Sequence, residues 1–142
     1  MAHEGALYCG ISRYKLGGSC LPPSPNANPG GAVYRWDGAG AWSHCGQLDE
    51  GNGIHCMCSF GGRLYATPTY GQQVYAYGGG TRWEPVGPDA RVMSLGFWND
   101  QLYALTSGAD AVYRYEGGRT WASCGRPAGT SQLYSFLVYQ GR

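Results

Sequence analysis

Short runs rich in apolar and aromatic residues, separated by turn signals, fill most of this chain. Residues 91–125 contain four of them in succession, "RVMSLGFW", "QLYALTS", "AVYRYEG" and "TWASCG". Between them stand Asn99-Asp100, Ser107-Gly108 and Gly117-Gly118, and such dipeptides favour tight turns between antiparallel strands. No stretch combines helical periodicity with capping signals. The pattern therefore predicts an all-β protein of short strands and tight turns.

The same pattern recurs with a fixed spacing. The segments "VYRWDGAGAWSHCG", "VYAYGGGTRWEPVG" and "VYRYEGGRTWASCG" begin at Val33, Val74 and Val112. In each, a tryptophan follows the valine by nine residues and a glycine follows it by 13. The second and third valines are also preceded, ten residues earlier, by "LYATP" and "LYALT". Units of about 40 residues with four strands each predict the blades of a β-propeller.

The first strand of each unit has no polar face. A strand that is apolar on both sides must be covered on both sides, since one that faced water would alternate. Blades packed against neighbours around a ring meet this condition, and the Tyr and Trp of the third and fourth strands supply large surfaces between blades. The equivalent positions are Ile54, Val92 and Leu133 on one face, and Met57, Leu95 and Phe136 on the other.

The hairpin between the third and fourth runs resembles the Asp-box, the Ser-x-Asp-x-Gly-x-Thr-Trp turn of sialidases and related propellers. "RYEGGRTW" keeps the glycine, threonine and tryptophan but has Glu116 for the aspartate and Arg114 for the serine, while "RWDGAGAW" keeps Asp37 and Trp42. The Tyr-x5-Trp spacing is similar to that of kelch-type blades, although their double glycine after the second strand is missing. The resemblance implies a propeller, and because the Asp-box is a structural turn it implies no glycosidase activity.

The units predict one domain that holds half of a ring. We expect strands two to four of a first blade over residues 7–46, with a loop insertion at 13–31, a second blade over 53–87, a third over 91–125, and strand one of a further blade over 132–140. Propellers typically have four to eight blades, so three are too few for one ring and two copies suffice. The alternative is a piece of a longer propeller.

The expected closure is a strand exchanged between two chains. The prediction is a six-bladed homodimer in which the C-terminal strand of one chain pairs with the strand over Leu7–Ser12 of its partner. Strand edges and aromatic faces that a single chain would expose are covered in such a ring. The residues expected to close it are Leu7, Tyr8, Leu133, Phe136 and Val138.

One long insertion interrupts the repeat. From Leu-Tyr to the following valine takes ten residues in two units but 26 in the first, where "RYKLGGSCLPPSPNANPGG" intervenes. Such a loop can be a tolerated surface insertion. In propellers, as the resemblance implies, the face that carries these loops usually holds the ligand. Aromatic, amide and cationic side chains there suit a carbohydrate or a peptide. The predicted ligand-binding residues are Tyr14, Lys15, Asn52, His55, Tyr70, Arg91 and Tyr134.

Composition and motifs narrow the function classes. A net charge of +1 with scattered arginines argues against a nucleic-acid partner. The first residues lack a signal-peptide pattern and no apolar run has membrane length, so we expect a cytoplasmic protein without a membrane partner, with secretion left open. G-x-S-x-G, His-x-x-x-His and phosphate-loop motifs do not occur. The leading hypothesis is a non-enzymatic binding protein without a cofactor that recognises a carbohydrate or a protein on the face bearing the 13–31 insertion. One alternative is a hydrolase or lyase with its site in the central channel, assisted by a metal at paired His55 residues. Another is an assembly without a ligand.

The six cysteines are expected to be free thiols. Cys45 and Cys124 occupy one repeat position, and the remaining unit has Val86 there, so cysteine acts at this position as a small hydrophobic residue. Cys56-Met57-Cys58 is not a CxxC motif and has no second pair of ligands at zinc-binding spacing. The sequence therefore predicts neither a disulfide framework nor a structural zinc site.

Overall fold

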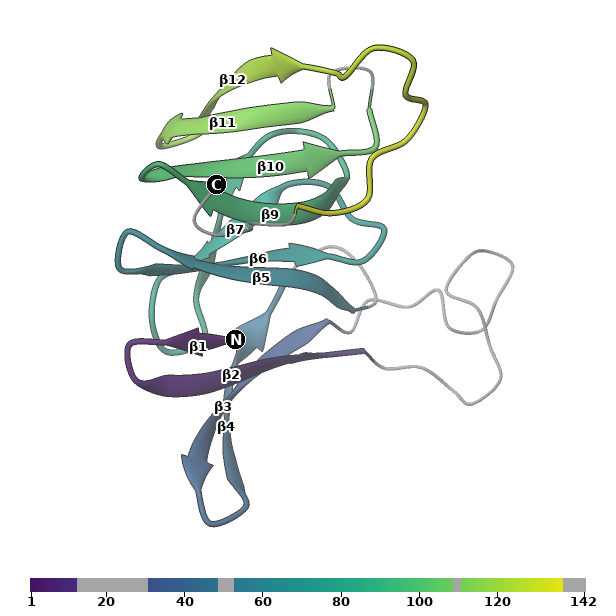
Figure 1. The fold of residues 1–142 in the computed structure, drawn as a ribbon. Coiled ribbons are helices and arrows are strands. Elements are labelled where there is room, and N and C mark those ends of the chain that lie inside the picture. The colour runs from purple at the N-terminus through teal and green to yellow at the C-terminus, as the bar shows by residue number, and fades with distance from the viewer. Residues whose placement is uncertain (13–30, 49–52, 109–110, 137–142) are drawn as a thin grey trace, which may run out of the picture.

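The computed structural model describes residues 1–12, 31–48, 53–108 and 111–136. In these residues the chain forms twelve strands and no helix, arranged as three four-stranded antiparallel sheets (Figure 1). The predicted all-β class and the four strands per sheet are confirmed. The three sheets lie side by side and do not close into a ring.

Each sheet is a meander in which consecutive strands are neighbours. The first contains β1 (Ala2–His3), β2 (Ala6–Ile11), β3 (Ala32–Gly38) and β4 (Ala41–Gln47). The second contains β5 (Ile54–Phe60), β6 (Arg63–Pro68), β7 (Val74–Tyr77) and β8 (Trp83–Gly87). The third contains β9 (Val92–Trp98), β10 (Gln101–Thr106), β11 (Val112–Gly117) and β12 (Thr120–Gly125).

The turns between the first two strands of each sheet have positive φ at both central residues. The values are 55° and 71° at Gly61-Gly62 and 46° and 54° at Asn99-Asp100. This is the geometry of two-residue hairpins, whose twist matches that of the strands. Glycine and asparagine adopt it readily, which explains why the sequence signals mark these turns correctly.

The first sheet differs from the prediction, because the chain supplies its own first strand. Residues Met1–His3 fold back through Glu4-Gly5, with Ala2 opposite Leu7 and His3 opposite Ala6. The amine of Met1 donates to the Tyr8 carbonyl, and the Tyr8 amide donates to the Met1 carbonyl, both at 2.8 Å. The place beside Leu7 and Tyr8 that was predicted for a partner strand is therefore occupied. A hairpin this short closes with little loss of chain entropy.

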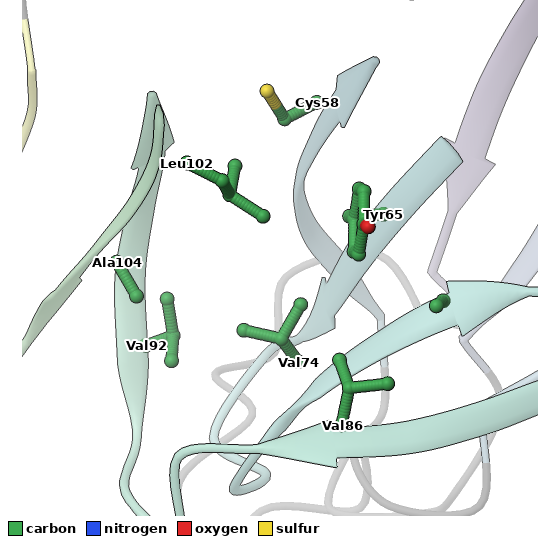
Figure 2. Close-up of a cluster of buried hydrophobic side chains, with 8 residues drawn as sticks. Cys58, Tyr65, Val74, Val86, Val92, Leu102 and Ala104 are labelled. Atoms are coloured by element: carbon green, nitrogen blue, oxygen red, sulfur yellow. The ribbon is translucent and has the colours of Figure 1, made fainter. Parts of the chain in front are cut away.

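Two joints hold the three sheets together, each with its own buried core. The first joint contains Tyr8, Val33 and Cys45 of the first sheet and Leu64 of the second. In the second joint, Leu102, Ala104 and Val92 of the third sheet face residues of the second (Figure 2). That opposing set is Cys58, Tyr65, Val74 and Val86. The same repeat positions thus form both cores.

The segment after β12 lies against the third sheet without forming a strand in its described part, residues 126–136. The Phe136 amide donates to Ser94 Oγ at 3.3 Å, and the Phe136 ring packs edge-on against Tyr103. The strand predicted over 132–140 is not formed in its described part, residues 132–136. Its other predicted closure residue, Val138, lies outside the described residues.

The cysteines in the described residues are all free thiols: Cys9, Cys45, Cys56, Cys58 and Cys124. Cys45 and Cys58 are buried in the two joints, as small hydrophobic residues would be. Cys124 is exposed, although it shares the repeat position of Cys45. A search of the described residues finds no helix with the length and apolar character needed to cross a membrane.

Candidate functional site

Tyr70 and Arg91, two of the predicted ligand-binding residues, are in contact. The guanidinium carbon of Arg91 lies 4.2 Å from the centroid of the Tyr70 ring. Tyr70 lies between β6 and β7, has a φ of 60° and is 41% exposed. Arg91 directly precedes β9 and is half-buried. Because a cation at this distance is attracted to the face of an aromatic ring, the two side chains form one surface.

Backbone hydrogen bonds fix the Arg91 segment between the second and third sheets. On one side the Gln73 amide donates to the carbonyl of Ala90 at 3.0 Å. On the other side the Ser107 amide donates to the carbonyl of Arg91 at 3.1 Å. Both neighbours belong to connections that join second and third strands. Residues from two different loops are thus held in one place, as a preformed binding site requires.

Arg119 ties the same edge to the third sheet. From the β11–β12 hairpin, its guanidinium donates to the Pro85 carbonyl at 2.9 Å, to Gln73 Oε1 at 3.2 Å and to Asp89 Oδ1 at 3.3 Å. Two of these partners adjoin the Arg91 segment: Asp89 lies two residues before Arg91, and the Gln73 amide bonds the Ala90 carbonyl. Arg119 was not among the predicted residues, because its partners lie 30 to 46 residues away in the chain and such contacts between sheets are not visible in the repeat pattern.

His55 lies apart from this pair, in the wall of a cavity. The cavity has a volume of about 280 Å³ and is lined by Met1, Gly10 and Ile54–Met57. Gly10 was missed as a lining residue, although a glycine inside a strand signals close approach of another group. A Cβ placed on Gly10 would lie 2.4 Å from Cβ of Ile54. The strands β2 and β5 therefore approach each other closely at this wall of the cavity.

Cys56 has no features of a nucleophile. Its sulfur lies 3.1 Å from Oγ1 of Thr67, and burial raises the pKa of its thiol. Burial likewise raises the pKa of Cys58 to about 11. Both thiols are protonated at neutral pH, whereas nucleophilic attack requires the thiolate. In the described residues no group of three or more His, Cys, Asp or Glu side chains could hold a metal ion.

The remaining predicted residues are dispersed or lie outside the described part. Tyr134 is 66% exposed, and its hydroxyl donates to Gln132 Oε1 at 2.8 Å. It lies in the segment that follows the third sheet. Tyr14, Lys15 and Asn52 lie outside the described residues. The structure therefore brings together one pair from the predicted set.

The hairpin that resembles an Asp-box is internally bonded. Asp37 accepts hydrogen bonds from the Ser43 hydroxyl at 2.5 Å and from Arg35 Nε at 3.0 Å. These two donors lower the pKa of the Asp37 carboxyl, with the hydroxyl contributing most. Arg114 bonds Glu116 in the same way at 2.7 Å. The acids of these hairpins thus stabilise the turns in which they lie.

Comparison with known proteins adds no family. The sequence matches no protein-family model, and no curated protein matches it either. The likeness to Asp-box and kelch blades therefore stays a prediction from the sequence pattern.

Proposed function

We propose that this chain is a non-enzymatic binding module that recognises a carbohydrate through the surface formed by Tyr70 and Arg91. The observation that carries the proposal is the guanidinium held 4.2 Å from the Tyr70 ring. Aromatic rings stack on the apolar faces of sugars, and a guanidinium donates several hydrogen bonds in a fixed geometry. The pair thus offers both kinds of contact from a single place.

The ligand class follows from charge and size. Among the described residues no carboxylate forms an ion pair with Arg91. A carboxylate on the ligand would complete that pairing, because arginine binds carboxylates through two parallel hydrogen bonds. A single ring and one cation offer less area than a protein interface, which needs a buried apolar centre. An acidic sugar therefore fits this surface better than a protein does.

The proposed architecture around the site is a six-bladed β-propeller made from two copies of the chain. Its support is the use of the same repeat positions in both joints, which makes each sheet a blade-like unit. Two copies would present two equivalent Tyr70–Arg91 surfaces on one face of the ring. Paired sites would raise the avidity for a multivalent glycan.

A glycan array carrying acidic and neutral sugars tests the proposal. The wild-type protein should select glycans with a carboxylate. By titration calorimetry with the selected glycan, Tyr70→Leu and Arg91→Gln should each weaken binding by about tenfold or more, a loss of about 1.4 kcal/mol. Leucine removes the aromatic face but, like tyrosine, has a Cβ, so it adds no new type of backbone strain at a position where φ is 60°.

Trp98→Leu is the matched control. Trp98 is a similarly exposed aromatic residue, 45% exposed, at the opposite end of the seven-residue strand β9. At about 3.3 Å per residue it lies roughly 20 Å from Arg91. Its replacement should leave glycan affinity unchanged. Equal losses in all three variants, or no acidic glycan among the ligands, would refute the proposed site.

A further inference from the structure

Each joint between sheets is built from a matched set of residues, and the two outer sheets each hold half of such a set. In the first joint, Leu64 is fully buried against Tyr8, Val33 and Cys45. In the second, Leu102 is fully buried against the equivalent residues. These are Tyr65, Val74 and Val86. The two joints thus follow one rule, in which a leucine of one sheet enters a trio on the preceding sheet.

In the first sheet, the equivalent leucine has no trio of residues from another sheet packed against it in the described part of the chain. Leu7, at the repeat position of Leu64 and Leu102, is 46% exposed while those two are 0% exposed. Trp36 and Trp42 stand where the joints have Tyr77 and Trp83, and they are 46% and 44% exposed. We call Leu7, Trp36 and Trp42 the leading face. The leading face has the same kinds of residue as the two joints, but its side chains are exposed because no neighbouring sheet among the described residues covers them.

In the third sheet, the equivalent trio is present, but no leucine of a following sheet packs on it in the described residues. Tyr103, Val112 and Cys124 occupy the positions of Tyr8, Val33 and Cys45, and we call them the trailing face. Cys124 is exposed, and Tyr103 and Val112 are half-buried, whereas the equivalent residues in both joints are buried. The trailing face therefore lacks the covering that the other two trios receive.

The backbone beside Cys124 also lacks the close neighbour that the equivalent backbone has in the two joints. In the joints the glycine after this position lies close to the next sheet: a Cβ on Gly46 would meet the Thr81 carbonyl oxygen at 2.2 Å, and one on Gly87 would meet the ring of Trp121 at 3.4 Å. A Cβ on Gly125 would meet no atom within 4 Å. All three glycines have positive φ, so the local backbone is alike and the neighbour is what differs.

We infer that the leading face of one chain docks on the trailing face of a second copy, twice around a two-fold axis, and so completes two further joints. The inference rests on the ring proposed above and specifies its contacts. The occupant is a second copy because the two open halves are complementary parts of one repeated joint, already assembled twice inside the chain. Figure 2 shows the second of these joints. Leu7 enters the trio of the partner, and Trp42 donates its indole N–H to the partner's carbonyl at the position of Cys124.

The cavity beside Gly10 belongs to the same junction. It is lined by Met1, which directly precedes β1, and by Gly10, in the part of β2 that has no first-strand neighbour in the described residues. In the second sheet the corresponding stretch of β6 pairs with Ile54–Met57 of β5. By the repeat, Leu133–Phe136 of the partner subunit corresponds to Ile54–Met57 and would therefore pair with this unpaired stretch of β2, next to Met1. Phe136 already lies against β9, where a first strand following the third sheet would lie.

Complementary charges at the docking faces test the inference. Leu7→Lys and Cys124→Glu change side chains that are exposed in the single chain, so each variant should fold, as circular dichroism would verify. Light scattering should give twice 15.3 kDa for the wild type and 15.3 kDa for each variant alone. An equimolar mixture should return to the dimer mass, because one joint then pairs lysine with glutamate and the other is wild type.

Several results would overturn the inference. These are a folded wild-type monomer, as expected if further repeats of a longer protein completed the joints; a mass above that of a dimer; single variants that remain dimeric; or a mixture that stays monomeric. Tyr70→Leu, which alters the proposed glycan site, should keep the dimer mass. A wild-type protein that has the dimer mass but binds no acidic glycan would therefore count against the site and not against the docking.

Discussion

The indole nitrogen of Trp83 donates a 2.7 Å hydrogen bond to the carbonyl oxygen of Cys45, 38 residues earlier in the chain. Trp121 makes the same bond, also 2.7 Å long, to the carbonyl of Val86. In both cases a tryptophan of one fourth strand binds the fourth strand of the preceding sheet. The regular spacing of tryptophans in the sequence thus corresponds to one repeated contact that links neighbouring sheets.

Replacing Trp83 by phenylalanine should destabilise the fold. The substitution keeps an aromatic ring in the joint but removes the donor, which leaves the Cys45 carbonyl without its partner. The expected loss in the free energy of unfolding is about 1–3 kcal/mol, measured by urea denaturation. Trp98→Phe, at an exposed position, is the control and should change stability by less than about 0.5 kcal/mol. Equal effects of the two substitutions would contradict a structural role for the indole bond.

Gly46→Ala should be more harmful than Gly117→Ala. Both glycines have φ near 100°, so an alanine is strained at either site. At Gly46 the new methyl group would also meet the Thr81 carbonyl oxygen, whereas at Gly117 it would meet no atom within 4 Å. We expect a loss of about 1–2 kcal/mol at Gly117 from strain, and a larger loss at Gly46. Thermal unfolding followed by circular dichroism would rank the two variants.

Stability should fall in alkali because of the Cys58 thiol. Burial raises its pKa to about 11 in the folded protein, compared with about 8.5 for an unfolded cysteine. The folded state therefore holds its proton to higher pH, so this contribution is complete below the unfolded pKa and is lost as pH rises towards 11. Urea midpoints at pH 7 and pH 10.5 should differ more in the wild type than in Cys58→Val. Identical pH dependence in the two proteins would show that Cys58 does not titrate in this way.

Thiol labelling should separate buried from exposed cysteines. Cys45 and Cys58 are 3% and 5% exposed and should resist an aromatic disulfide reagent until the protein unfolds. Cys124 is exposed in the single chain, so it should react fully in the Leu7→Lys variant and slowly in a wild-type dimer. Peptide mapping by mass spectrometry would locate the label. Rapid labelling of Cys45 in the native protein would contradict the packing of the first joint.

Much of the fold is readable from spacing in the sequence. The valine, tryptophan and glycine positions predicted three equivalent units, and the turn dipeptides located most strand ends, because these signals depend on contacts within one hairpin. The pairing of Tyr70 with Arg91 was foreseeable only in part. Their loops were expected on one edge, but the distance between the side chains depends on how neighbouring sheets pack.

Sequence alone determined the all-β class, the repeat and the turns, since each follows from local backbone preference and from period-two patterning. Tertiary structure decided that Met1–His3 complete the first sheet, and that Leu7 and Cys124 are exposed although their repeat equivalents are buried. The physical reason is that burial belongs to a pair of surfaces and not to a residue. Equivalent side chains differ when one of them has a neighbouring sheet and the other does not.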